Sequence, residues 1–106
     1  MNHLMVGELT RTKRETRLQT ALKEPRQYKV VLLDDDYTPM DYVVEILMRF
    51  FHFNGAMAVE IMLQIHTKGR GICGVFTKDV AETKVYLVKQ DARKHGYPLM
   101  ARIEPE

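Results

Sequence analysis

Apolar and polar residues follow one another along this chain in blocks that predict three strands and three helices. Residues 28–33 form a β-branched and aliphatic run that three aspartates close, which is typical of a buried strand. A second strand is predicted over residues 72–76. A third is predicted over residues 99–104, where every second residue is apolar.

Between these strands, apolar residues recur at steps of three or four, as they do on the buried face of an α-helix. The first helix is predicted to begin with Thr38 as its N-cap and Pro39 as its first helical residue. Asn54 and Gly55 end this helix and cap the second, which is expected to end near Gly69.

A third helix is predicted to begin after Thr77 and to stop at Gly96 and Pro98. The predicted order is therefore βααβαβ. We expect an α+β fold, a single small domain with a three-stranded antiparallel sheet and three helices packed on one face.

Composition and charge divide the chain into two parts. Its 106 residues suffice for one domain, and a hydrophobic fraction of 45% with 28% charged residues is ordinary for a soluble protein. Residues 1–26 hold six basic and three acidic groups, whereas the remainder carries a net charge near zero. We therefore expect residues 1–25 to be a flexible basic N-terminal extension and residues 26–106 to be the folded domain.

Several functional classes lack their usual signals. No stretch is apolar enough to cross a bilayer or to act as a secretory signal, and one cysteine, Cys73, fits a reducing cytoplasm. The glycines of the segment 69–74 follow a helix and open a strand, which is the reverse of a dinucleotide-binding loop. The chain contains no serine and no zinc-ligand spacing, which counts against hydrolase chemistry and against a zinc site.

The strongest chemical signal is the run Asp34-Asp35-Asp36 directly after the first strand. Three adjacent carboxylates repel one another, and they form either a solvated turn near a helix N-terminus or a functional cluster. A functional cluster could bind a divalent metal, act as the phosphoacceptor of a receiver domain, or capture a cationic ligand. The receiver alternative conflicts with the predicted order, because that fold alternates strand and helix five times.

Further along the chain, several segments resemble the ClpS family of adaptors of bacterial Clp proteases. Residues 33–40 (LDDDYTPM) resemble its N-D-D-Y-T-P-M segment, and residues 62–66, 71–77 and 81–85 match later motifs in the same order. The resemblance covers roughly residues 22–106. It implies an adaptor that is not an enzyme and needs no metal or cofactor. Such an adaptor binds N-degrons, which are a free α-amino group on a first Leu, Phe, Tyr or Trp, and delivers them to the AAA+ unfoldase ClpA of the ClpAP protease.

The resemblance also implies the site. Asp34, Asp36 and His66 are expected to face the amine, and Asp35 to hold the peptide backbone beyond it. Met40 is expected to exclude β-branched first residues. The family usually has Asn at position 34, so Asp34 here is expected to strengthen the attraction for the amine. The first side chain is expected in a hydrophobic pocket formed by Leu32, Thr38, Met40, Val43, Met62, Ile65 and Leu99.

The remaining partners follow from the same resemblance. Asp79 and Lys84 are expected to contact the N-terminal domain of the unfoldase, and the extension to engage its entrance. We expect a cytoplasmic monomer without a nucleic-acid or membrane partner. The alternatives are a receiver-like signalling domain that uses Asp34, Asp35 and Asp36, and a small RNA- or ribosome-associated module that uses the basic extension.

Overall fold

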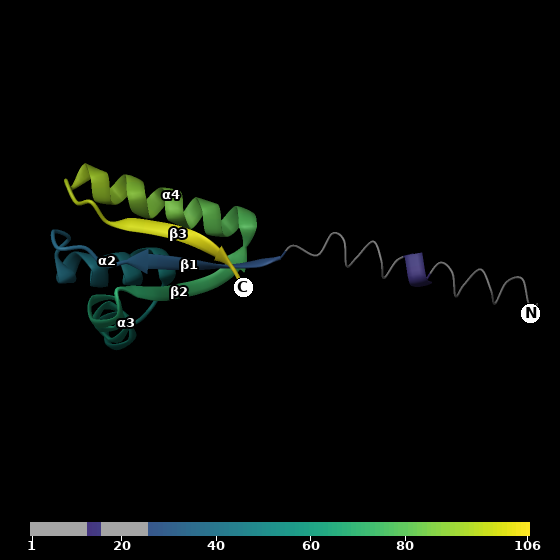
Figure 1. Cartoon of the computed structure of the whole chain (residues 1–106), viewed down its shortest axis with the longest axis horizontal. Helices are drawn as coiled ribbons and strands as arrows, with labels where there is room; N and C mark the ends of the chain where they lie inside the picture. The colour runs from purple at the N-terminus through teal and green to yellow at the C-terminus, as the bar shows by residue number, and fades with distance from the viewer. Residues whose placement is uncertain (1–12, 16–25) are drawn as a thin grey trace, which may run out of the picture.

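The computed structural model describes residues 13–15 and 26–106, and the longer range contains three strands and three helices (Figure 1). In chain order they are β1 (Gln27–Leu33), α2 (Met40–Phe51), α3 (Gly55–Lys68), β2 (Arg70–Thr77), α4 (Lys78–Lys94) and β3 (Met100–Pro105). The predicted βααβαβ order is confirmed. Of the predicted extension, all but residues 13–15 lies outside the described residues, so its flexibility and its boundary stay predictions.

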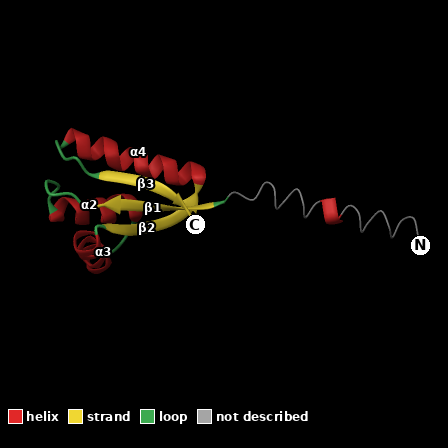
Figure 2. Cartoon of the chain, in the orientation of Figure 1, coloured by secondary structure: helices red, strands yellow, loops and turns green. Residues whose placement is uncertain are grey.

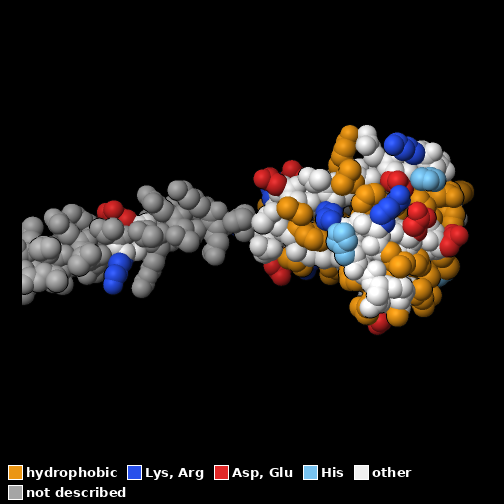
Figure 3. Space-filling view, turned by 180° about the vertical axis from the view of Figure 1, so that it is seen from behind, with side chains coloured by type: hydrophobic (Ala, Val, Ile, Leu, Met, Phe, Trp, Pro, Cys, Tyr) orange, Lys and Arg blue, Asp and Glu red, His pale blue; other side chains and the backbone are white. Residues whose placement is uncertain are grey.

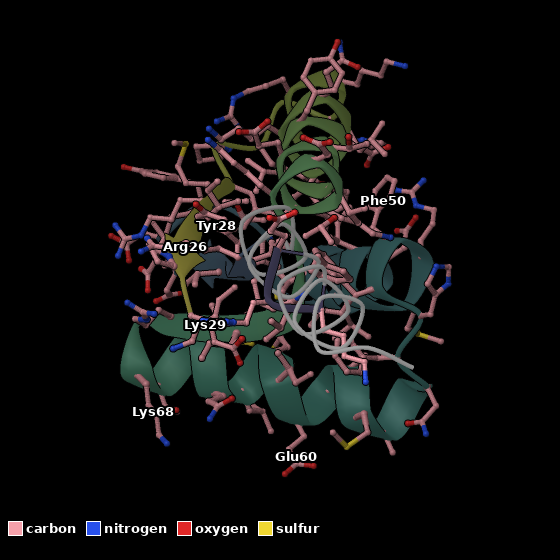
Figure 4. All side chains as sticks on the ribbon, turned by 90° about the vertical axis from the view of Figure 1, so that its right-hand side faces the viewer. Arg26, Tyr28, Lys29, Phe50, Glu60 and Lys68 are labelled. Carbon is pink, nitrogen blue, oxygen red and sulfur yellow. The ribbon has the colours of Figure 1, made fainter. Side chains whose placement is uncertain are left out.

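The strands form one antiparallel sheet in the order β2-β1-β3. The helices cover one face of it (Figure 2), and Figure 4 shows this from the side, with Glu60 and Lys68 on α3 pointing away from the body. The predicted fold class is confirmed. Leu33 pairs with both Arg70 and Met100, so the end of β1 and the starts of its two neighbours share one edge of the sheet.

The core lies between the sheet and the helices. Val30 and Leu32 of β1 are fully buried against Ile46 and Leu47 of α2, Ile65 of α3 and Val88 of α4 in one apolar cluster. Alternate residues of a strand point to one face, so these β1 side chains anchor all three helices to the same side of the sheet. The last residue of β1 therefore reaches the edge where α2 begins and α3 ends.

Two glycines bring α3 close to β2. Gly69 ends α3 in the left-handed conformation, with φ 85°, which glycine adopts without steric cost. A Cβ atom on Gly71 would lie 2.5 Å from Cγ1 of Ile65, so a larger residue there would push α3 away from the sheet. The glycine run of this segment therefore serves packing and helix termination.

Cys73 occupies a bulge in β2. Val30 pairs with Gly74 and Val31 pairs with Ile72, which leaves Cys73 as the extra residue. Its side chain is 2% exposed, and burial raises the pKa of the thiol to about 12. The thiol is therefore protonated at neutral pH and is a packing group.

A polar cluster joins α2 to α4. The Tyr42 hydroxyl and the Arg49 guanidinium both donate to the carboxylate of Asp91, the latter over 2.8 Å. The Tyr42 hydrogen bond, followed by the Arg49 charge, holds the pKa of Asp91 below its usual value despite an opposing effect of burial. Figure 3 views this helical side and shows acidic, basic and histidine side chains gathered there. The cluster therefore links α2, through Tyr42 in its first turn and Arg49 in its last turn, to the end of α4.

None of the helices in the described ranges combines the length and the apolar character that crossing a membrane requires.

Candidate functional site

A cavity of about 190 Å³ opens at the edge where β1 ends, α2 begins and α3 ends. An apolar cavity of about 150 Å³ is large enough to hold a benzene ring, so this one can accept a large side chain. Its walls come from the β1–α2 connection, the first turn of α2 and the last turns of α3. The lining residues are Asp34, Asp35, Asp36, Thr38, Met40, Val43, Met62, Ile65 and His66.

The polar rim of the cavity joins β1 to α3. The Asp34 backbone N–H donates to the Gly69 carbonyl over 2.9 Å, which ties the end of β1 to the end of α3. His66 lies one turn before that carbonyl, and its Nδ1 atom lies 3.8 Å from Asp34 Oδ1. This distance is too long for a hydrogen bond, so both side chains can direct these atoms toward a third, donating group. Both are solvent-accessible, with 51% of the His66 side chain and 33% of that of Asp34 exposed.

Asp35 organises the connection between β1 and α2. Its Oδ1 atom accepts from the backbone N–H groups of Tyr37 (2.8 Å) and Thr38 (2.7 Å), and its Oδ2 atom accepts from the Thr38 hydroxyl (2.7 Å). Burial by itself raises the pKa of Asp35, but the hydrogen bonds from Thr38 and Tyr37 outweigh it and lower the pKa below its usual value. The Asp35 carboxylate thus fixes the shape of the turn, and Asp35 also lines the cavity.

The N-cap predicted at Thr38 is wrong. Helix α2 begins at Met40, Pro39 occupies the N-cap position, and no side chain there bonds the first turn. Thr38 lies two residues before the helix, and its hydroxyl donates a hydrogen bond to the Asp35 carboxylate instead. The short-range pattern did not distinguish a threonine that caps a helix from one that closes the preceding turn.

Replacing Asp35 with Asn is expected to lower the free energy of unfolding at neutral pH, because the ionised carboxylate is the stronger acceptor. The native pKa of Asp35 is lowered, so this contribution is present above the unfolded-state pKa, about 4, and is lost as the pH falls through the native value. Urea unfolding of the wild type and of Asp35→Asn between pH 7 and pH 3 measures this contribution to the free energy of unfolding. A stability difference that stays constant over this range would contradict the assignment.

The interior of the cavity is apolar. Val43, Met62 and Ile65 are buried, with 7%, 9% and 2% of their surface exposed, and they line its inner wall. Met40 lies at the mouth with 43% exposed. Of the predicted pocket residues, Leu32 and Leu99 belong to the fully packed core and are not among the lining residues. They support the cavity from within the core.

The two residues expected to contact the unfoldase lie elsewhere, in the first half of α4. Asp79 is exposed in the first turn, and a shallow depression beside it includes Lys84 and the exposed Val80 and Leu87. The ammonium of Lys84 donates to the Phe50 carbonyl over 2.6 Å, at the end of α2. Its charge therefore also stabilises the C-terminus of that helix.

Two alternative uses of the aspartates lack structural support. Within residues 13–15 and 26–106, no three His, Cys, Asp or Glu side chains converge on a point where they could hold a metal ion. A three-stranded antiparallel sheet is also not the alternating, five-stranded arrangement that a receiver domain needs. Capture of a cationic ligand is the use that agrees with the acidic and histidine side chains at the cavity rim.

All nine lining residues are among those proposed from the sequence. The sequence did not indicate the contacts that shape the rim, namely those of Gly69 with Asp34 and of Thr38 with Asp35. It also did not indicate Tyr37, which is 79% exposed beside the cavity. The D-x-x-T spacing of residues 35–38 is the local signal that could have predicted the turn.

Sequence comparisons identify relatives of most of the chain. Residues 23–102 match the family model described as "ATP-dependent Clp protease adaptor protein ClpS". The ATP-dependent Clp protease adapter protein ClpS of Alkalilimnicola ehrlichii is 53% identical over 83 residues, which cover 78% of this chain and 78% of that protein.

A solved structure shares the fold as well. Agrobacterium tumefaciens ClpS2 bound to L-phenylalaninamide superimposes with a TM-score of 0.76 at 36% identity. The match covers 77% of this chain and 99% of that one. This relative thus agrees in both sequence and tertiary structure with most of this chain.

Proposed function

The chain belongs to the ClpS family of ATP-dependent Clp protease adaptors, and on this premise we propose that it binds N-degrons and delivers them to the ClpA unfoldase of the ClpAP protease. The degron is a free α-amino group on a first residue with a bulky hydrophobic side chain: Leu, Phe, Tyr or Trp. The observation that carries the proposal is the position of an acidic and histidine rim directly over an apolar cavity.

The rim suits an α-ammonium group. This group has three N–H donors and one positive charge, and it needs acceptors on more than one side. Asp34, Asp36 and a neutral His66 nitrogen supply such acceptors around the mouth of the cavity. The Oδ2 atom of Asp35 accepts one hydrogen bond within the turn. A carboxylate oxygen can accept more than one, so this atom can also accept from the first backbone N–H of the peptide.

The cavity suits the first side chain. Burying a Leu or Phe side chain contributes roughly 1.5–3 kcal/mol, and each hydrogen bond to a charged group about 1.5–3 kcal/mol. Micromolar binding requires about 8 kcal/mol, which neither the buried side chain nor three such hydrogen bonds at the middle of their range, about 7 kcal/mol, reach alone. The degron therefore needs both features. Phenylalaninamide, the ligand of the Agrobacterium relative, combines a free amine with such a side chain.

Delivery requires a second surface that stays accessible while the cavity is filled. We assign it to residues 79–87 of α4, with Asp79, Lys84 and the exposed Val80 and Leu87 facing the N-terminal domain of the unfoldase. As part of the same proposal, the protein acts in the cytoplasm as a monomer and without a cofactor.

Addition of this protein to ClpA, ClpP and ATP is expected to accelerate degradation of a fluorescent reporter that begins with Phe, but not of one that begins with Gly. The loss of fluorescence measures both rates. Asp79→Ala is the matched variant, because it is expected to bind the Phe peptide normally and to deliver it poorly. Equal rates with and without this protein would contradict the proposed delivery.

A further inference from the structure

A second, open depression lies on the other side of the turn that walls the cavity. Its lining residues are Tyr37, Arg93, Gly96, Tyr97, Pro98 and Met100. Asp36 and Thr38 line the first cavity, whereas Tyr37 between them lines the second depression. The turn that Asp35 organises is therefore a partition between two adjacent recesses.

The side chains of the depression are aromatic or apolar and surround one cation. Tyr37 is 79% exposed and Met100 is 44% exposed, and neither belongs to the core. The guanidinium of Arg93 donates from Nη1 to the carbonyls of Tyr97 (2.8 Å) and Leu99 (3.0 Å). Its Nη2 lies 3.2 Å from Met100 Sδ. These contacts hold the guanidinium in place, so it offers a fixed planar cation to a ligand.

The two recesses also lie at the same end of the molecule. Figure 1 shows the tip of β1, the start of α2, the end of α4 and the start of β3 gathered there. Asp35, Asp36 and Thr38 of the turn line the cavity, so a peptide whose first residue fills the cavity can leave it past this turn. Because successive side chains of an extended chain point in opposite directions, the second one is directed away from the first, across the partition.

We propose that this depression is the subsite for the second residue of the bound peptide and favours an aromatic side chain there. The inference rests on the proposed function of the cavity. A planar ring gains both from contact with tyrosine and from stacking on a guanidinium.

The test is fluorescence anisotropy with two peptides that begin with free Phe and differ only in their second residue, Phe or Ala. The wild type is expected to bind the Phe-Phe peptide about three- to tenfold more tightly. Tyr37→Ala is expected to remove most of this preference. Tyr86→Ala is the matched control, since Tyr86 is also exposed, at 58%, but lies on α4 outside the depression, and it should keep the preference.

Equal affinity of the wild type for both peptides would overturn the subsite, and so would a preference that Tyr37→Ala leaves intact. The N-acetylated Phe-Ala peptide separates this result from the proposed function. If the free Phe-Ala peptide binds and its acetylated form does not, the first-residue site holds even where the second-residue subsite fails. If no free-amine peptide binds, both assignments fall.

Discussion

A peptide that begins with free phenylalanine is expected to bind this protein at least about a hundredfold more tightly than the same peptide with an acetylated amino group. Acetylation removes the positive charge and two of the three N–H donors. In the proposed site, Asp34, Asp36 and His66 then lose their donor group, and the added acetyl group has to fit among them. Isothermal titration calorimetry on the matched pair measures the difference.

The same calorimetric measurement on His66→Ala is the control for the rim. His66 is half exposed and lies outside the core, so the variant is expected to fold normally and to bind the free peptide more weakly. Similar affinities for the free and acetylated peptides would contradict the proposed amine site. An unchanged affinity in His66→Ala would remove that residue from it.

Replacing Leu32 with Ala is expected to lower the free energy of unfolding by about 2–5 kcal/mol. Leu32 is fully buried in the core, at 0% exposure, and lies outside the cavity lining. The substitution leaves a void that the surrounding sheet and helices fill only in part. Urea denaturation followed by circular dichroism measures the loss.

Met40→Ala is the matched comparison at the mouth of the cavity. Met40 is 43% exposed, so this substitution is expected to change the stability by less than about 0.5 kcal/mol. It should instead weaken binding of a Phe-initiated peptide, because Met40 lines the cavity. If Leu32→Ala unfolded at the same urea concentration as the wild type, the position of Leu32 in the core would be wrong.

The local sequence was sufficient for the order of the elements and for several of their ends. Asn54 caps α3 with its side chain, accepting from the Met57 N–H, as short-range preferences indicate. Gly69 ends the same helix in the left-handed conformation. The prediction at Thr38 was wrong because its hydroxyl has two possible partners, and the choice depends on how the chain turns before α2.

The composition of the candidate site was also predictable, since its polar and apolar residues belong to two short segments with recognisable motifs. The sequence did not separate residues that line the cavity from those beneath it. Leu32 and Met62 are both apolar and were both assigned to the pocket, but only Met62 reaches the cavity. Exposure to a cavity depends on the packing of several elements, which periodicity along one element does not encode.

The sequence by itself determined which segments become strands and helices, which faces are apolar, and which side chains carry charge, because these depend on spacing along a single element. The tertiary structure decided that Asp34 lies near His66, which is 32 positions further along the chain, through the bond to the Gly69 carbonyl and the close approach at Gly71. It also decided that one turn separates two recesses. Both outcomes depend on distances between elements, and only the packing of α3 and α4 against one sheet sets those distances.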